Sequence, residues 1–118
     1  MLEFNNMIEE YKFGSIVING NSYDYDVEVR FDDKVFEWRR GESHLVHIND
    51  IKRALLAEPD LIIFGTGQTG GMEVSLEVRE KIKNQGIALE IFKTAKAVKE
   101  FNKAVKNRKA IGLFHLTC

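Results

Sequence analysis

Apolar and polar residues alternate over the first third of the chain. In residues 23–31 every second side chain is apolar: Tyr23, Tyr25, Val27, Val29 and Phe31. This period of two predicts a β-strand with one buried and one solvated face. Residues 14–22 predict an earlier strand that ends in a type I′ turn at Asn19-Gly20. Residues 35–40 predict a later strand, so we expect an N-terminal antiparallel meander in which Phe36 and Trp38 share the buried face.

The second half changes to a helical period that alternates with apolar runs. We predict helices capped by Asn49, Ser75 and Thr94, the first ending before Pro59 and the second at Gly86. The third has one apolar face: Ala97, Val98, Phe101, Ala104 and Val105. Strands are predicted at 61–64, 87–92 and 110–116. This alternation of strand and helix indicates a layered α/β sheet covered by helices.

Several short motifs, taken in order, resemble a known family over nearly the whole chain. They are Tyr11-Lys12-Phe13-Gly14, Trp38-Arg39-Arg40 followed by His44, Gly65-Thr66-Gly67, Gly86-Ile87, Thr94 with Ala97, Phe101 and Asn102, and the closing His115-Leu116-Thr117-Cys118. The family consists of small uncharacterised domains and includes a mitochondrial assembly factor for respiratory complex I and an adipogenesis-associated protein. The resemblance implies a three-layer α/β domain with a central mixed sheet and a small added β element. It brings no established catalytic activity with it.

Length and composition agree with one domain over residues 1–118. No apolar stretch exceeds about five residues, whereas a membrane-spanning helix needs about 20. Residues 1–14 lack the basic and apolar regions of a signal peptide. A single cysteine gives no reason to expect an oxidising compartment. We therefore expect a cytoplasmic protein without a membrane span.

Charge is unevenly distributed, although the net charge is only −1. Residues 1–78 hold 7 basic and 15 acidic side chains, whereas residues 79–109 hold 10 basic and 3 acidic ones. Four lysines share the polar face of the third helix: Lys96, Lys99, Lys103 and Lys106. Such a stripe is usually a solvated face, but it can also dock an acidic partner, such as the acidic meander of another copy. No aromatic residues are interleaved with the lysines, which argues against nucleic acid.

A glycine-rich stretch follows the apolar run at residues 61–64. Three of its glycines match the G-x-G-x-x-G pattern of dinucleotide-binding folds: Gly65, Gly67 and Gly70. In those folds the helix begins directly after the glycines, so that its N-terminus faces the pyrophosphate. Here residues 72–74 separate the glycines from Ser75, and Glu73 would repel a phosphate. A Walker A motif is also excluded, because Gly70 is not followed by Lys and Ser or Thr.

Two interpretations of this stretch remain. It is either a tight turn that needs positive φ where the backbone passes close to a neighbour, or a looser site for a small anion or polar ligand. The residues of the looser site would be Gly65, Thr66, Gly67 and Gly70, together with Arg39, Arg40 and His44.

Two further groups of residues have the composition of chemical sites. Cys118 with His115 as a base has the residue types needed for nucleophilic catalysis. However, the α-carboxylate expected beside the sulfur would make the thiol a poorer nucleophile. The alternative is that both residues pack into the domain. His44 and His47 form H-x-x-H near Glu42 and Asp50. Zinc sites usually need three or four ligands, and no pair of cysteines supports these two histidines. We therefore expect no metal, and we expect no cofactor either.

The direction of the last strand decides whether these groups can meet. The mixed sheet of the resembling family suggests that strand 110–116 runs against its neighbours, which would put His115 and Cys118 at the opposite edge from the glycines.

The favoured function is a non-catalytic interaction or assembly-type domain with an unknown protein partner or a second copy. The alternative is a small-ligand or anion-binding protein, or an enzyme, that uses residues 65–71. An open cavity at these residues would favour the alternative, and a covered loop would favour the interaction domain.

Overall fold

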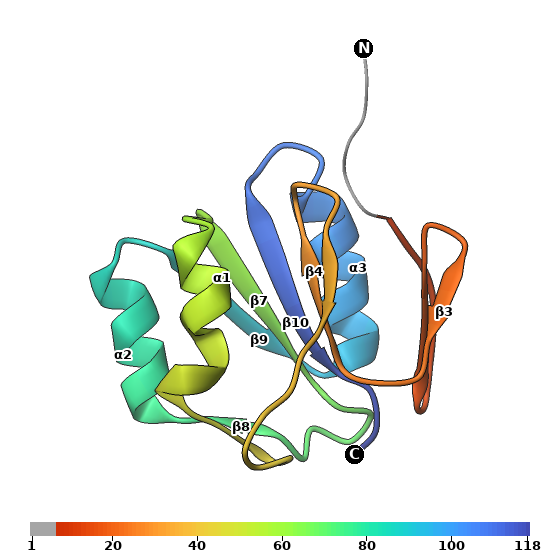
Figure 1. The fold of residues 1–118 in the computed structure, drawn as a ribbon, viewed down its shortest axis with the longest axis horizontal. Coiled ribbons are helices and arrows are strands. Elements are labelled where there is room, and N and C mark those ends of the chain that lie inside the picture. Colours follow the sequence, from red (N-terminus) through yellow and green to blue (C-terminus); the bar gives the residue numbers. More distant parts are fainter. Residues whose placement is uncertain (1–6) are drawn as a thin grey trace.

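A mixed five-stranded sheet forms the centre of the computed structural model, which describes residues 7–118 (Figure 1). The strands lie in the order β5 (Val35–Glu37), β4 (Val27–Arg30), β10 (Ala110–His115), β7 (Leu61–Thr66) and β9 (Ala88–Phe92). β10, β7 and β9 are parallel, and β4 runs antiparallel to both β10 and β5. Every residue of β7 and β10 is buried, as expected of central strands that are covered on both faces.

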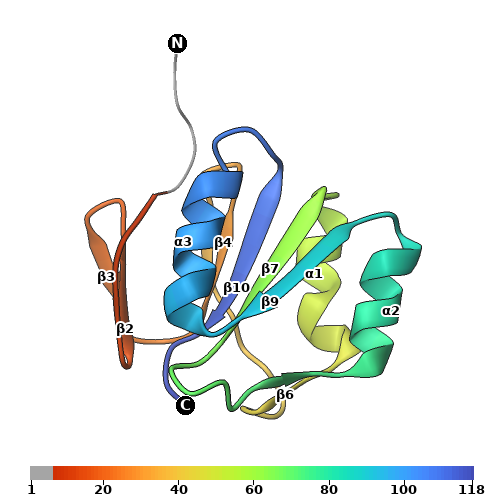
Figure 2. The ribbon, with the colours of Figure 1, turned by 180° about the vertical axis from the view of Figure 1, so that it is seen from behind.

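Helices cover both faces of this sheet. They are α1 (Lys52–Leu56), which follows the 3₁₀ helix η1 (Ile48–Ile51), α2 (Leu76–Asn84) and α3 (Thr94–Ala104). Phe101 of α3 shares one core with Leu61 and Ile63 of β7, whereas Ile62 and Phe64 point into a second core with η1, α1 and α2. Figures 1 and 2 show α3 and α1 on opposite sides of the sheet. None of the described helices is long and apolar enough to cross a membrane.

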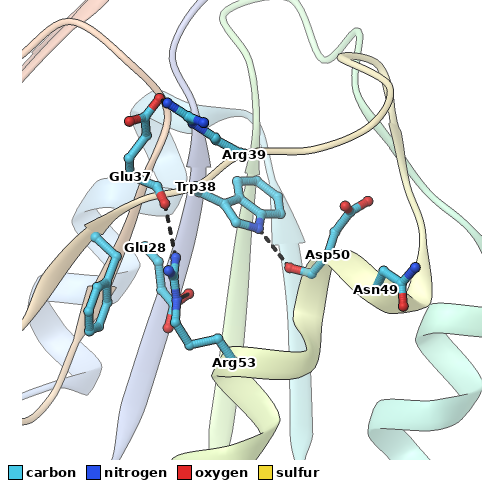
Figure 3. A pocket seen from close by; sticks show the side chains of 8 residues that line it. Glu28, Glu37, Trp38, Arg39, Asn49, Asp50 and Arg53 are labelled. Carbon is cyan, nitrogen blue, oxygen red and sulfur yellow. Dashed lines mark hydrogen bonds and ion pairs between the residues drawn. The ribbon is translucent and has the colours of Figure 1, made fainter.

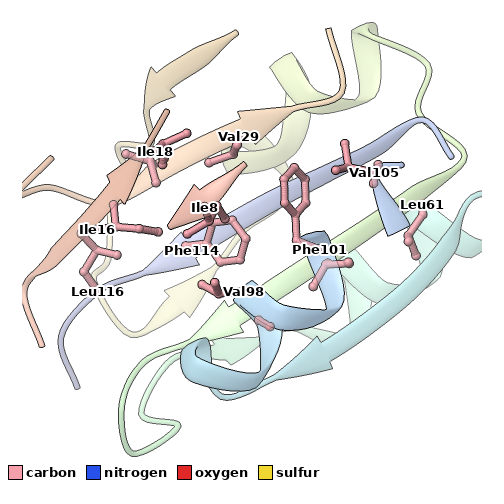
Figure 4. Close-up of a cluster of buried hydrophobic side chains, with 14 residues drawn as sticks. Ile8, Ile16, Ile18, Val29, Leu61, Val98, Phe101, Val105, Phe114 and Leu116 are labelled. Carbon is pink, nitrogen blue, oxygen red and sulfur yellow. The ribbon is translucent and has the colours of Figure 1, made fainter. Parts of the chain in front are cut away.

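The N-terminal residues form a second sheet beside α3. Its antiparallel strands are β1 (Ile8–Lys12), β2 (Ser15–Ile18) and β3 (Asn21–Tyr23). Ile8 and Ile16 join the core under α3 (Figure 4). The Asn102 side chain of α3 completes the contact, because it donates to the Ile8 carbonyl at 2.8 Å and accepts from the Ile8 N–H at 3.0 Å. The predicted turn is confirmed by positive φ at Asn19 (50°) and Gly20 (83°).

A short parallel pair completes the architecture. β6 (Leu45–Val46) pairs with β8 (Glu73–Val74) near the carboxyl ends of the central strands (Figures 1 and 2). The predicted fold class is therefore confirmed: an α/β domain with a central mixed sheet, helices on both faces and an N-terminal antiparallel meander.

The single strand predicted over residues 23–31 is wrong. β3 ends at Tyr23 and β4 begins at Val27, so β4 and β5 belong to the central sheet rather than to the meander. Asp26 is held in the break, since its Oδ1 accepts from the Leu116 N–H at 2.8 Å. The expected faces are wrong as well, because Glu28 is buried and Tyr25 is 41% exposed.

The helix ends follow the predicted signals only in part. Ser75 caps α2 as predicted, with its Oγ 3.3 Å from the backbone N–H three residues on, and Gly86 adopts φ 75° beyond the end of that helix. Asn49 is not a cap. η1 begins after His47, whose N–H donates to Asp50 Oδ2 at 2.7 Å. The helical segment therefore begins two residues earlier than predicted, after His47 rather than after Asn49.

Truncation of Phe101 tests the core under α3. Its ring is fully buried, and the centroid of the ring lies 5.8 Å from that of the Phe114 ring. We expect Phe101→Ala to lower the free energy of unfolding by about 3–5 kcal/mol, measured by urea denaturation, because a large cavity remains. Lys103→Ala on the exposed face of the same helix should change it by less than about 0.5 kcal/mol. Similar losses in both variants would contradict this assignment of the helix faces.

Candidate functional site

The glycine-rich stretch and the end of the chain lie at the same edge of the sheet. β10 runs parallel to β7, with His115 opposite Thr66, so the predicted reversal of the last strand is wrong; the antiparallel neighbour is β4. The reason is that α3 carries the chain across one face from β9 to β10, as strand–helix–strand units do in parallel sheets. The glycine loop (residues 65–71) therefore meets the C-terminal segment (residues 115–118).

The C-terminal segment fills the glycine loop. The backbone N–H groups of Gln68 and Gly71 donate to main-chain oxygens of Thr117 and Cys118, each at 2.7 Å. The Thr69 hydroxyl also donates to the main-chain oxygen of Cys118, at 2.9 Å. A bound anion would need these same donors, and they are satisfied within the chain.

Glycine is required in this loop for two reasons. Gly67 and Gly70 adopt φ values of +105° and +80°, which disfavour a side chain. A Cβ on Gly67 would also overlap the main chain of Cys118, whereas Gly70 has room for one. At Gly65 the constraint is contact alone, since a Cβ there would lie 2.9 Å from the Thr94 hydroxyl. The glycines thus permit close packing of the loop, α3 and the C-terminal segment.

Threonine hydroxyls connect the segments at this edge. The Thr94 hydroxyl donates to the His115 carbonyl at 2.6 Å and accepts from the Gly67 N–H at 2.8 Å. Because this side chain bonds to neighbouring segments, the prediction that Thr94 caps α3 is wrong; Lys93 occupies the cap position. The Thr66 hydroxyl donates to the last carbonyl of β9 at 3.1 Å. Both hydroxyls therefore hold main chain rather than point into a cavity.

Asp26, Arg40 and His115 form a buried charged cluster beside the loop. Asp26 Oδ2 lies 2.8 Å from both Arg40 Nη2 and His115 Nδ1. Arg40 Nη2 also donates to the Ser43 carbonyl at 2.8 Å. The Arg40 guanidinium lies 4.4 Å from the centroid of the Trp38 ring, and Trp38 itself is only 3% exposed, which confirms its predicted burial.

This cluster keeps Asp26 ionised. Burial alone would raise the pKa of Asp26, but hydrogen bonds from His115, the Leu116 N–H and Arg40 outweigh burial and hold the pKa below its ordinary value. Since the native pKa is depressed, the carboxylate stabilises the fold above the pKa of an unfolded aspartate, about 3.9. That contribution is lost as the pH falls through the native pKa.

The other residues considered for a ligand or metal site do not form one site. Arg39 is 85% exposed and pairs with a neighbouring glutamate. His44 is exposed, and its ring lies 5.6 Å from that of His115. His47 Nε2 instead pairs with Glu42 Oε2 at 2.8 Å. Among residues 7–118, no group of three or more His, Cys, Asp or Glu side chains could hold a metal ion.

Cys118 and His115 have different environments. The expectation that both pack into the domain is correct for His115, which is buried, and wrong for Cys118, which is exposed. His115 uses Nδ1 in the charged cluster, and its Nε2 lies 3.4 Å from Thr117 Oγ1. No hydrogen bond joins the imidazole to the thiol in the described part of the chain, so the pair lacks the contact on which nucleophile–base catalysis depends.

Two cavities flank Trp38, and the glycine loop lines neither of them. An open groove of about 520 Å³ is lined by residues that include Asp26, Arg39, Arg40 and Ser43. A second cavity of about 390 Å³ lies beside η1 and α1 and reaches the buried Glu28. Sequence reasoning missed Asp26 and Glu28, because strict alternation assigned both to a solvated face.

Comparison with known proteins identifies the family. Residues 8–115 match the family described as a protein of unknown function (DUF498/DUF598). The chain belongs to this family. The resemblance expected from the motifs is thereby confirmed, including the kinship with the respiratory complex I assembly factor and the adipogenesis-associated protein.

Solved structures share the fold of this DUF498/DUF598 protein. The conserved hypothetical protein PH1505 from Pyrococcus horikoshii OT3 is 21% identical with a TM-score of 0.87, and the match covers 94% of this chain and 98% of that one. A structure named MT938 is 24% identical, with a TM-score of 0.81 and coverage of 97% and 100%. A Mth938-like domain from Bordetella pertussis is 16% identical, with a TM-score of 0.68 and coverage of 94% and 85%. These likenesses concern the fold alone.

Substitution of Gly67 tests the packing of the C-terminal segment. We expect Gly67→Ala to lower the free energy of unfolding by about 3 kcal/mol, because the methyl group is strained at positive φ and displaces Cys118. Gly70→Ala is the matched control and should cost only about 1 kcal/mol, from its conformation alone. Urea denaturation measures both. A Gly67→Ala variant as stable as the wild type would show that the segment does not occupy the loop.

Neutralisation of Asp26 tests the charged cluster. Asp26→Asn keeps the shape of the side chain but leaves the Arg40 guanidinium buried without its counter-ion. We expect a loss of about 3–5 kcal/mol at pH 7. The loss shrinks as the pH falls below about 4, where the unfolded wild-type chain takes up a proton that the native carboxylate does not, and it is smallest below the native pKa of Asp26. Urea denaturation over this pH range measures the difference, with exposed Asp24→Asn as the control. A difference that does not change with pH would contradict the depressed pKa.

Proposed function

We propose that this DUF498/DUF598 protein is a non-catalytic interaction or assembly-type domain that binds a protein partner. The observation that supports it most directly is the occupied glycine loop, whose donors already bind main-chain oxygens of Thr117 and Cys118. The groove lined by Arg39 and Arg40 does not include the loop. The kinship with an assembly factor points in the same direction.

The surface that we assign to the partner is the lysine face of α3. Its members are exposed: Lys96, Lys99, Lys103 and Lys106. Residues 93–109 contain seven basic side chains and one acidic side chain. Internal contacts of the face are few, since Lys103 lies 3.6 Å from Glu100 and Lys96 lies over the Phe92 ring. Most of this positive charge is available to an acidic segment of a partner.

The surroundings of the lysine face favour a protein over a membrane or a nucleic acid. None of the large exposed apolar side chains of the described residues lies on α3; they are Met7, Phe13, Tyr25, Leu56 and Leu76. Insertion into a membrane surface uses apolar residues beside the cations, and binding of single-stranded nucleic acid uses aromatic ones. A narrow stripe of lysines suits an acidic helix or strand.

A second copy of this chain fits less well than a different acidic protein. The acidic half of the sequence uses many of its carboxylates internally. Asp26 and Glu28 are bound by arginines inside the domain. Glu9 accepts a hydrogen bond from a backbone N–H at 2.6 Å, and Glu10 lies 3.4 Å from a neighbouring lysine. Both acidic side chains of the meander strands β1–β3, Glu9 and Glu10, therefore already have a contact within the chain.

Charge reversal on α3 tests the docking face. The probe is a fluorescein-labelled helical peptide with glutamates spaced to match the lysines, and binding is followed by fluorescence anisotropy at about 50 mM salt. We expect Lys99→Glu/Lys103→Glu to bind about tenfold more weakly than the wild type, because each substitution replaces an attraction with a repulsion.

Lys81→Glu/Lys83→Glu on α2 is the matched control, since it changes net charge equally outside the face. Equal weakening by both double variants would mean that net charge, not the lysine face, binds the peptide. The partner is a second copy if the wild type does not bind the peptide and sediments as a dimer, whereas the Lys99→Glu/Lys103→Glu variant sediments as a monomer.

A further inference from the structure

The cavity beside Trp38 has the features of a ligand site on the face of the sheet opposite α3. It lies between the β4–β5 pair and the η1–α1 segment (Figure 3). Its volume of about 390 Å³ is at the small end of the range typical of small-molecule sites, about 300–1,000 Å³. Three carboxylates and two guanidinium groups line it. The occupant should therefore be small and charged or highly polar.

Glu28 is the most deeply buried of these charges. Its side chain is 1% exposed, and its Oε1 accepts from Arg53 Nε at 3.0 Å. Its Oε2 has no hydrogen-bond partner among the described residues, although Arg30 Nη1 lies 3.7 Å away. Because Oε2 is itself sealed from solvent, a ligand does not reach it directly; Glu28 instead places a negative charge beneath the cavity.

Arg53 lies beside Glu28, and Arg39 lies at the rim beside Glu37 (Figure 3). Arg53 lies 4.3 Å from the centroid of the Phe36 ring, and its Nη2 donates to the Glu37 carbonyl at 2.9 Å. These contacts hold the Arg53 guanidinium in place while leaving 45% of its side chain exposed. Arg39 projects from the rim, where its Nε donates to Glu37 Oε2 at 3.2 Å, and is 85% exposed. Both guanidinium groups have further N–H groups that can donate to a carboxylate.

Asp50 and Asn49 lie across the Trp38 indole from Arg53 (Figure 3). The indole Nε1 donates to the Asp50 carbonyl at 2.8 Å, which fixes η1 against the cavity. The side chain of Asp50 adds a second carboxylate, and the exposed Asn49 offers an amide that can both donate and accept. Negative and positive groups thus face one small volume from different directions.

We propose that this cavity binds a small zwitterion of the free amino-acid type. Its ammonium group would lie near Asp50 and above the buried charge of Glu28, and its carboxylate would face Arg53 and Arg39. A simple anion would meet three carboxylates, and a simple cation would meet two guanidinium groups; a molecule that carries both charges complements both sets. This site is independent of the lysine face of α3.

Calorimetric titration of the full chain with each free proteinogenic L-amino acid at about 10 mM tests the proposal, together with the rise in melting temperature that binding to the native state produces. The amino acid that binds is then compared with its methyl ester, which lacks the carboxylate, and its N-acetyl form, which lacks the ammonium group. We expect each derivative to bind about tenfold more weakly, because each loses hydrogen bonds between charged groups.

Variants of exposed lining residues locate the site without disturbing the core. Arg39→Ala and Asn49→Ala should weaken binding about threefold to tenfold. Lys81→Ala, in a separate groove lined by Ile48 of η1 and by residues of α2, should leave it unchanged. Lys99→Glu/Lys103→Glu should also bind the amino acid normally, which separates this proposal from the docking face. The proposal is overturned if no amino acid binds, if the derivatives bind as tightly as the zwitterion, or if Arg39→Ala and Asn49→Ala bind like the wild type.

Discussion

Asp26 joins three parts of the chain that are distant in sequence. Its carboxylate accepts from the Leu116 N–H and contacts Arg40 and His115, while its carbonyl accepts from the Trp38 N–H. The start of β4, the segment after β5 and the end of β10 are thereby held at one point. Because this point is largely dry, the charges depend on one another, and a buried guanidinium without its carboxylate is strongly destabilising. The rest of this edge of the sheet is arranged around that constraint.

The position of the C-terminal segment follows from this cluster. Once His115 is held by Asp26, the next residues run directly over the glycine loop, where Gln68 and Gly71 bind their main-chain oxygens. A dinucleotide-binding loop must instead leave its amides open and begin a helix immediately. The same glycine spacing therefore serves packing in this fold. Its positive φ angles and missing side chains make room for main chain rather than for a pyrophosphate.

Local signals in the sequence predicted local structure well. The Asn19-Gly20 turn, the Ser75 cap and the buried face of α3 each depend on residues close in sequence. The direction of β10 depends on neighbours that the sequence does not name. Its continuous apolar run was nevertheless a usable signal, because a strand buried on both faces is typical of the centre of a parallel region.

Charged residues within strands were harder to interpret. Glu28 fits perfect alternation, and its burial is tolerable because Arg53, 25 positions away, and Arg30 both pair with it. Pairings between distant charges decide the site, and no local period encodes them.

The arginines and the lysines of this chain have different roles on its two faces. Arg40 and Arg53 lie in the N-terminal half and bind buried carboxylates, as their planar, multiply donating groups favour. Lys99 and Lys106 lie on or just after α3 and remain solvated, as compact and strongly hydrated ammonium groups do. The cavity beside Trp38 and the lysine face consequently lie on opposite sides of the central sheet (Figures 1 and 2). A small ligand in the cavity and a protein partner on α3 would therefore not compete for space, so the two proposed activities can coexist in a single domain.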